Sequence, residues 1–271
     1  MSTLFDLSGK NALLTGGTGA LGTAMAKGLL AAGARVALLS RNPDNLRSAK
    51  EELDGGKGSV LLLRGDVTDY ASLQSAAEEL REKWGKLDIL VNAAGGNRPG
   101  ATISPDQTFF DLSIEDFAGV SKLNLDGTVI PSLIFGKMIT ENGTGSIINI
   151  SSMAADRAIT RVVGYSAAKA GIDNFTKWLS VEMARKYDGK VRVNAIAPGF
   201  FIGEQNRRLL TNEDGSLTER GQTIIKNTPM NRFGEADELI STLVYLCVDA
   251  SSFVTGIVVP VDGGFSAFSG V

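Results

Sequence analysis

Seven short apolar runs recur along the chain, each bounded by Gly, Asp, Asn or Pro. They are NALLT, ARVALLS, SVLLLRG, LDILVN, SIINIS, VRVNAIA and GIVVPV. Runs of this length and composition predict short buried strands. Between them lie longer stretches in which apolar residues recur with the period of a helix. These stretches predict helices at about 20–32, 43–54, 69–84, 113–140, 163–187 and 235–248.

The alternation of strand and helix defines the fold class. A strand, a helix and a second strand in succession form a right-handed crossover between parallel neighbours. Repetition of this unit predicts one α/β domain over residues 1–271, with a doubly wound (Rossmann-type), seven-stranded parallel sheet flanked by helices on both faces. No linker-like break, low-complexity segment or internal repeat divides the chain.

Composition narrows the class of protein. The apolar content of 43% and charged content of 21% are typical of a globular enzyme, and the net charge of −3 argues against a broad nucleic-acid surface. No apolar run reaches the length of a membrane span, and the N-terminus MSTLFDLSGK lacks the pattern of a signal peptide. We therefore expect a cytoplasmic protein with no membrane partner.

Histidine is absent and cysteine occurs once, which removes several kinds of chemistry. The absence of histidine excludes Ser-His-Asp and Cys-His catalysis and histidine-ligated metals. A single cysteine forms no internal disulfide or multi-cysteine zinc site, so no metal site is expected. Cys247 lies in the apolar stretch TLVYLCV, which favours a buried packing role over a nucleophilic one.

The first predicted strand runs through TGGTGALG, residues 15–22, directly into a predicted helix. Glycines at such a turn let the backbone approach a pyrophosphate, and the helix N-terminus supplies free N–H groups. This position favours a dinucleotide site over a purely structural turn. Asp66, Asn92, Ser152 and Pro198 follow later strands, at the edge where parallel sheets bind ligands.

Tyr165 and Lys169 stand four residues apart on a predicted helix and therefore share one face. A fixed ammonium next to a phenol favours the phenolate and lowers the phenol pKa, so the pair predicts a proton-transfer device. Alone the spacing is a weak signal, since it also arises by chance. Its context is the pair Ser151 and Ser152, which follows the strand SIINI.

These motifs together resemble the short-chain dehydrogenase/reductase family over essentially the whole chain. The matching positions are Thr15–Gly22, Asp66–Val67, Asn92–Gly95, Asn124, Ser152, Tyr165, Lys169, Pro198–Gly199 and Val261–Gly264. The resemblance implies that Tyr165 exchanges a proton with the substrate oxygen and that Ser152 polarises the same oxygen. It also implies that Lys169 lowers the tyrosine pKa and binds ribose, and that Asn124 holds a water molecule of the proton relay.

For the cofactor, the predicted set of contacts follows the same motifs. It comprises Thr15, Gly16, Thr18, Leu21, Gly22, Ser40, Arg41, Asp66, Val67, Asn92, Ala93, Gly95, Tyr165, Lys169 and Pro198. Three positions depart from the family pattern. Ala20 replaces the middle glycine of the phosphate loop, Ala93 replaces an asparagine, and Gly203 replaces a threonine that contacts the nicotinamide carboxamide in many members.

Cofactor choice depends on the end of the second strand, where an acidic residue would accept from a ribose 2′-hydroxyl and repel a 2′-phosphate. The chain has Ser40 and Arg41 there, and arginine pairs with phosphate. This favours NADP(H). NAD(H) remains the alternative, with Arg41 solvated across the adenine.

Substrate recognition is expected from a lid at about 200–232 and from neighbouring segments. The predicted substrate contacts are Arg98, Arg157, Arg161, Gln205 and Arg207. Several arginines around one pocket would suit a small anionic, hydroxylated substrate, although each alone is also an ordinary surface residue. The patterns AGGNRP and PGFF-x-x-EQNR and the ending GGFSAFSG resemble a sugar-acid branch of the family, of the D-mannonate or D-fructuronate type.

Two alternatives remain open for the function. One keeps the oxidoreductase chemistry and changes the substrate to a 3-oxoacyl thioester or another ketone; the other is a non-catalytic, cofactor-binding redox sensor. For the assembly, the resemblance implies a homotetramer. Phe265 and Phe268 in the apolar C-terminal segment would pack on a neighbouring subunit or, alternatively, on their own domain.

Overall fold

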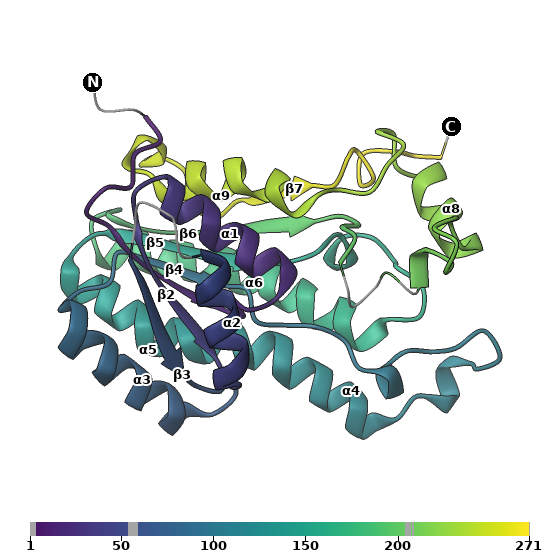
Figure 1. The fold of residues 1–271 in the computed structure, drawn as a ribbon, viewed down its shortest axis with the longest axis horizontal. Coiled ribbons are helices and arrows are strands. Elements are labelled where there is room, and N and C mark those ends of the chain that lie inside the picture. The colour runs from purple at the N-terminus through teal and green to yellow at the C-terminus, as the bar shows by residue number, and fades with distance from the viewer. Residues whose placement is uncertain (1–3, 54–58, 204–206, 208, 271) are drawn as a thin grey trace.

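Seven parallel strands form a single sheet in the order β3-β2-β1-β4-β5-β6-β7 (Figure 1). The computed structural model describes residues 4–53, 59–203, 207 and 209–270. The strands are β1 (Asn11–Thr15), β2 (Arg35–Ser40), β3 (Val60–Arg64), β4 (Ile89–Asn92), β5 (Gly145–Ile150), β6 (Val191–Pro198) and β7 (Val258–Val261). Each coincides with one of the predicted apolar runs. The predicted fold class is therefore confirmed.

Helices cover both faces of the sheet, as Figure 1 shows. One face carries α1 (Ala20–Ala31), α2 (Pro43–Leu53) and α9 (Ile240–Cys247); the other carries α3 (Tyr70–Trp84), α5 (Gly127–Asn142) and α6 (Val163–Lys186). Shorter elements are α4 (Ile114–Ser121), α8 (Glu219–Lys226) and the turns η1 (Pro99–Ala101), η2 (Phe109–Asp111), η3 (Lys122–Asp126), η4 (Met153–Ala155), η5 (Ala236–Leu239) and η6 (Asp249–Ser251).

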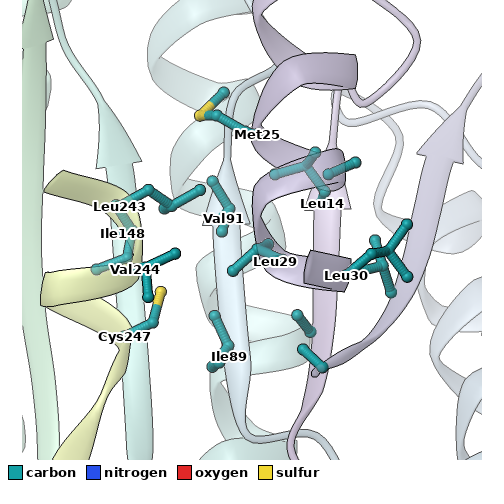
Figure 2. Close-up of a cluster of buried hydrophobic side chains, with 14 of the residues drawn as sticks. Leu14, Met25, Leu29, Leu30, Ile89, Val91, Ile148, Leu243, Val244 and Cys247 are labelled. Atoms are coloured by element: carbon teal, nitrogen blue, oxygen red, sulfur yellow. The ribbon is translucent and has the colours of Figure 1, made fainter. Parts of the chain in front are cut away.

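Two hydrophobic cores explain why the strands read as continuous apolar runs. Successive strand residues point to opposite faces, so in β1 Leu14 joins the core under α1 and α9 while Leu13 joins the core under α3 and α5. Figure 2 shows the first of these cores, where Leu29 of α1 and Leu243 of α9 lie over the strands β4 and β5. Because both faces are covered, a strand has no solvent-facing side that would select polar residues.

Cys247 lies in the core under α9 with 3% exposure, which confirms the predicted packing role. Burial raises the pKa of its thiol to about 12, so the reactive thiolate is disfavoured at neutral pH. In the described part of the chain, no helix combines the length and the apolarity needed to cross a bilayer.

The predicted helix at 113–140 is wrong in one respect. The structure has α4, then the π-helical turn η3, and then α5, so the stretch is helical but not regular. Turns of this kind inside helices are frequently found at functional sites. Asn124 lies within it.

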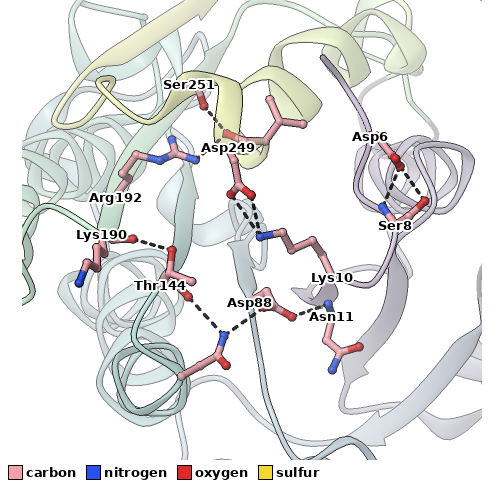
Figure 3. A network of polar contacts seen from close by, with 12 residues as sticks. Asp6, Ser8, Lys10, Asn11, Asp88, Thr144, Lys190, Arg192, Asp249 and Ser251 are labelled. Carbon is pink, nitrogen blue, oxygen red and sulfur yellow. Dashed lines mark hydrogen bonds and ion pairs between the residues drawn. The ribbon is translucent and has the colours of Figure 1, made fainter. Parts of the chain in front are cut away.

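Polar contacts close the edge of the sheet where the strands begin (Figure 3). Asp88 accepts from the backbone N–H of Asn11 at 2.8 Å, and the Lys10 ammonium pairs with Asp249 at 3.1 Å. Arg192 donates to the carbonyl of Val248 at 3.1 Å. With this edge tied by internal contacts, the opposite edge, where the strands end, is the place to look for a ligand site.

Candidate active site

The turn between β1 and α1 is shaped for an anion. Gly16 has a φ of +66°, and a Cβ atom there would lie 2.7 Å from Cα of Ala94. A Cβ on Gly22 would lie 2.3 Å from the carbonyl oxygen of Gly16. Gly19 caps α1 without a side-chain hydrogen bond, and the first turn holds no acidic residue. The first N–H groups of a helix have no intrahelical partner, and Ala20, Leu21 and Gly22 line the adjoining cleft, which fits the pyrophosphate of a dinucleotide.

A cleft of about 930 Å³ extends from this turn along the strand ends. Nine of the predicted cofactor residues line it: Gly16, Thr18, Leu21, Gly22, Ser40, Arg41, Val67, Ala93 and Gly95. Other residues of the wall were not among the predicted cofactor contacts: Ile202 lies in the predicted lid, and Leu123, Ala236 and Asp237 lie outside every predicted site. Ala236 and Asp237 belong to η5, far away in sequence, and no motif marks them.

Three other predicted cofactor residues lie behind this wall. Thr15 is fully buried, and its hydroxyl accepts from the backbone N–H groups of Ala93 and Ala94 at 3.1 and 3.2 Å. Asn92 is 1% exposed and donates to Asn149 at 2.9 Å. Pro198 ends the fully buried strand β6. Their side chains brace the strand ends.

The Asp66 carboxylate forms hydrogen bonds within its own turn. Its carboxylate accepts from the backbone N–H and the hydroxyl of Thr68 at 2.9 and 2.8 Å, and Arg41 lies 3.7 Å away. Burial raises the pKa of Asp66, but the Thr68 hydrogen bonds and the charge of Arg41 outweigh it, so the net pKa lies below its usual value. Asp66 therefore stays ionised and holds Arg41 beside the cleft.

The predicted catalytic groups converge where β5 ends and α6 begins. Lys169 is 4% exposed and donates to the carbonyl of Ile150 at 2.6 Å; its ammonium lies 5.4 Å from the centre of the Tyr165 ring. Ser152 lies close enough to the Tyr165 hydroxyl to lower the pKa of the phenol. The i, i+4 spacing on α6 thus brings phenol and ammonium onto one face, as the sequence predicts.

The expected effect of Lys169 on Tyr165 does not appear. Burial raises the pKa of the Tyr165 phenol, and the Ser152 hydrogen bond only partly offsets this. Burial also lowers the pKa of Lys169 to about 8, so burial destabilises the protonated form of Lys169. In this structure desolvation dominates, and Tyr165 is kept protonated.

Asn124 joins this group through the π-helical turn. Its amide donates to the carbonyls of Gly96 and Val120 at 2.7 and 2.8 Å and accepts from the N–H of Gly96 at 3.1 Å. A Cβ on Gly95 would lie 2.6 Å from the Asn124 amide oxygen and 3.5 Å from the Lys169 ammonium. The side chain thus links η3 to the loop after β4, next to Lys169.

Asp173 was not foreseen. It stands one turn beyond Lys169 on α6, and its Oδ1 is buried without a hydrogen bond among the described residues. Burial raises the pKa of Asp173, while Ser151, Lys177 and Lys169 act in the opposite sense. In turn, its charge raises the pKa of Lys169 against the effect of burial. A further i+4 step from Lys169 was the signal that could have found it.

The five predicted substrate residues lie in different surroundings. Arg98 lies against α4, where a Cβ on Gly119 would meet its Nη1 at 2.6 Å. Arg157 pairs with Asp156 and donates to the carbonyl of Ser266. Arg161 has a φ of +76°, and Arg207 is exposed. Gln205 lies outside the described residues.

The C-terminal segment packs on its own domain. The rings of Phe200 and Phe265 meet edge to face at 5.2 Å, and Phe268 is half-buried. Nearby, two departures from the family pattern face each other. A Cβ on Gly203 would lie 3.7 Å from the methyl group of Ala20. Compared with the family pattern, the chain therefore lacks a side chain at position 203 and carries an additional methyl group at position 20, and these two positions are adjacent.

Known proteins resemble the chain over its whole length. The family model described as "Enoyl-(Acyl carrier protein) reductase" matches residues 17–266. UxuB, an uncharacterized oxidoreductase of Bacillus subtilis (strain 168), is 43% identical over 275 residues, which cover 98% of each protein.

Solved structures agree with this fold. A Haemophilus influenza protein, provisionally assigned as a D-mannonate oxidoreductase and crystallised with bound NAD, is 39% identical, with a TM-score of 0.91 and 98% of both chains covered. A gluconate 5-dehydrogenase of Burkholderia cenocepacia J2315 in complex with NADP and tartrate is 30% identical, with a TM-score of 0.84 over 97% of this chain and 98% of that one. These complexes support a nicotinamide cofactor.

The glycine turn, the cleft and the group around Tyr165 match the motifs that carried the resemblance. Oxidoreductase relatives over the full length favour an enzyme over a cofactor-binding sensor. The chain belongs to the short-chain dehydrogenase/reductase family, oxidoreductases that act on alcohol or ketone substrates.

Proposed function

We propose that the protein is a sugar-acid oxidoreductase that interconverts a keto sugar acid of the D-fructuronate type and a hydroxy acid of the D-mannonate type. The observation that carries the chemistry is the convergence of Ser152, Tyr165 and Lys169 beside the dinucleotide cleft. The substrate class draws support from the resemblance to a provisionally assigned D-mannonate oxidoreductase and to a gluconate 5-dehydrogenase.

In this proposal Tyr165 is the general acid of the reduction. Its raised pKa keeps the proton on the phenol at neutral pH, which is the form that can donate to the substrate oxygen. Ser152 hydrogen-bonds the same oxygen as negative charge develops on it. Lys169 supplies a positive charge that stabilises the phenolate left behind. Bound nicotinamide supplies or accepts the hydride.

Asn124 has a positioning role in the proposal. Its amide spans η3 and the loop after β4 through its bonds with Gly96, and it lies beside the Lys169 ammonium. It would therefore fix the path by which Lys169 recovers a proton from solvent. The segment 200–232, which includes α8, serves as the substrate lid.

We further propose that the protein prefers NADP(H) to NAD(H). Arg41 lines the cleft directly after β2, and Ser40 stands where an acidic residue would repel a 2′-phosphate. Both NAD and NADP occur in the related structures, so the preference rests on these two residues of this chain.

A 3-oxoacyl thioester is the second candidate substrate, because the matching family model is named for an enoyl-(acyl carrier protein) reductase, which also acts on a carrier-bound thioester. The test is a panel of D-fructuronate, a neutral ketose and a 3-oxoacyl thioester, each offered with NADPH or NADH while reduced nicotinamide is followed by absorbance. Fructuronate-dependent oxidation that Tyr165→Phe abolishes supports the proposal. If only the thioester is turned over, the 3-oxoacyl thioester replaces the sugar acid as the proposed substrate.

The proposed assembly is a homotetramer. Leu133 of α5 and Trp178 and Val181 of α6 carry exposed apolar side chains on helices that cover the same face of the sheet. Such side chains would be covered by a second copy. Light scattering of the purified protein and of Trp178→Glu tests this; an unchanged monomer in both removes it.

A further inference from the structure

A second cavity lies at the edge of the sheet where the strands begin, at the other end of the strands from the candidate active site. It has a volume of about 270 Å³ and adjoins the polar contacts drawn in Figure 3. Residues at the start of β4, β5 and β6 and at the end of α9 form much of its wall, and the charged groups in that wall are Lys10, Asp88, Lys190, Arg192 and Asp249. A water molecule takes up about 30 Å³, so the cavity has room for a small metabolite. None of the described residues lines both this cavity and the dinucleotide cleft, so the two are separate.

Arg192 is a buried cation in this wall. It is 6% exposed, and burial lowers the pKa of its guanidinium below the ordinary value. Its Nη atoms donate to the carbonyls of Leu246 and Val248 at the end of α9, at 2.8 and 3.1 Å. Carbonyls at the end of a helix carry about half a negative charge, which balances only part of a guanidinium. Within the described residues no Asp or Glu forms an ion pair with Arg192, and its Nε–H has no hydrogen-bond partner.

The carboxylates of the wall are engaged by other groups. Asp88 is buried and pairs with Lys86 at 3.1 Å. Asp249 pairs with Lys10 at 3.1 Å, and its side chain is 79% exposed. In Figure 3 Asp249 lies between Lys10 and Arg192, so one exposed carboxylate serves two cations. This part of the wall therefore carries more positive charge than its carboxylates balance.

We infer that this cavity binds a small anion through a carboxylate or phosphate group held by Arg192 and Lys10. Guanidinium pairs with both kinds of group through parallel hydrogen bonds, and Arg192 has its Nε–H to offer. The Lys10 ammonium adds a point charge with rotatable donors at the same wall. The remaining cation, Lys190, lies 3.8 Å from Asp188, and because both side chains are largely in solvent we assign it no role. A ligand bound in the cavity stabilises the folded chain by mass action.

The test is a calorimetric titration of the enzyme with inorganic phosphate and, separately, with succinate. The enzyme is first saturated with nicotinamide cofactor, so that the glycine turn before α1 is occupied and does not bind the probe. Sodium chloride at matched ionic strength measures the non-specific effect of salt. The variants are Asp249→Asn and Arg192→Lys. Glu79→Gln is the matched control, because it removes the carboxylate of another surface ion pair, with Lys83 at 2.6 Å, and lines neither cavity.

The wild type is expected to bind the probe saturably, with one anion per chain, whereas sodium chloride gives no such signal. Asp249→Asn is expected to tighten binding about 2- to 5-fold, because it removes a carboxylate that competes for Lys10 and repels the anion. Arg192→Lys is expected to weaken binding about 10-fold or more, because it keeps the charge and loses the paired hydrogen bonds. Glu79→Gln binds like the wild type. The probe that binds more tightly identifies the group, phosphate or carboxylate, that the cavity selects.

A gain of affinity in Asp249→Asn cannot come from a loss of structure, so this variant tests the site even if Arg192→Lys does not fold. The inference is overturned if neither probe binds the wild type beyond the effect of sodium chloride. It is also overturned if Asp249→Asn binds no more tightly than Glu79→Gln, or if a folded Arg192→Lys binds like the wild type. None of these measurements uses a sugar acid or hydride transfer, so their result is independent of the proposed function.

Discussion

Arg41→Ala separates the two candidate cofactors. The Arg41 side chain is 69% exposed at the end of β2, and its Nη1 lies 3.7 Å from Oδ2 of Asp66. If Arg41 receives the 2′-phosphate of NADP(H), its loss weakens that cofactor alone. If it is solvated across the adenine, its loss affects NAD(H) and NADP(H) alike.

The expected change in cofactor affinity follows from the contacts that Arg41→Ala removes. A hydrogen bond to a charged group contributes about 1.5–3 kcal/mol, and the high exposure of Arg41 puts the expected effect at the lower end. An exposed ion pair such as that with Asp66 contributes at most about 1 kcal/mol, and its loss is common to both cofactors. We therefore expect the Kd of NADPH to rise about 10- to 30-fold and that of NADH to change less than about 3-fold.

Fluorescence titration of NADPH and NADH measures both affinities without any substrate. Arg35→Ala is the matched control: Arg35 begins the same strand at its opposite end, where its guanidinium lies 4.5 Å from the centre of the Trp84 ring. Added salt should weaken NADPH binding more steeply in the wild type than in Arg41→Ala. Equal weakening of both cofactors, or tighter binding of NADH than of NADPH by the wild type, refutes the reasoning.

Two further predictions concern charge and packing at the site. Asp173→Asn removes the carboxylate that supports the charge of Lys169, so the pKa of Lys169 falls below about 8 and activity is lost at a lower pH on the alkaline side. The pH profile of kcat/KM checks this against Asp188→Asn, which removes an exposed carboxylate beyond the end of α6; coincident alkaline limbs of the wild type and Asp173→Asn contradict it. Gly203→Thr is expected to strengthen cofactor binding several-fold, because it restores the threonine that contacts the nicotinamide carboxamide in many members of the family, and a Cβ at position 203 would lie in ordinary van der Waals contact, 3.7 Å from the Ala20 methyl group. Fluorescence titration of the cofactor checks this, and weaker binding by Gly203→Thr contradicts it.

The lowered pKa of Lys169 also has a consequence for stability. An unfolded lysine keeps its proton up to about pH 10.4, so between about pH 8 and that value the unfolded chain binds more protons than the folded one. The contribution of Lys169 to the free energy of unfolding therefore rises with pH across this window. The buried ammonium costs stability below pH 8, where the proposed chemistry needs its charge.

Much of the fold could be predicted because the sheet is covered on both faces. In β5, Ile147 faces the core under α3 and α5 while Ile148 faces the core under α1 and α9, so neither position tolerates a polar residue. The irregular turn at Asn124 could not be predicted this way. Its cause is a set of hydrogen bonds from the Asn124 amide to Gly96 and Val120, and apolar periodicity does not report such bonds.

In the candidate site too, local contacts could be predicted from the sequence and contacts between distant segments could not. Tyr165 and Lys169 were found because their partnership is local, one turn apart on a single helix. Ala20 and Gly203 were each recognised as a departure from the family pattern, but their spatial relation depends on how the segment after β6 folds back over α1. Sequence alone therefore predicts chemistry that one helix carries, whereas contacts between separate segments, such as that between positions 20 and 203, follow from the fold.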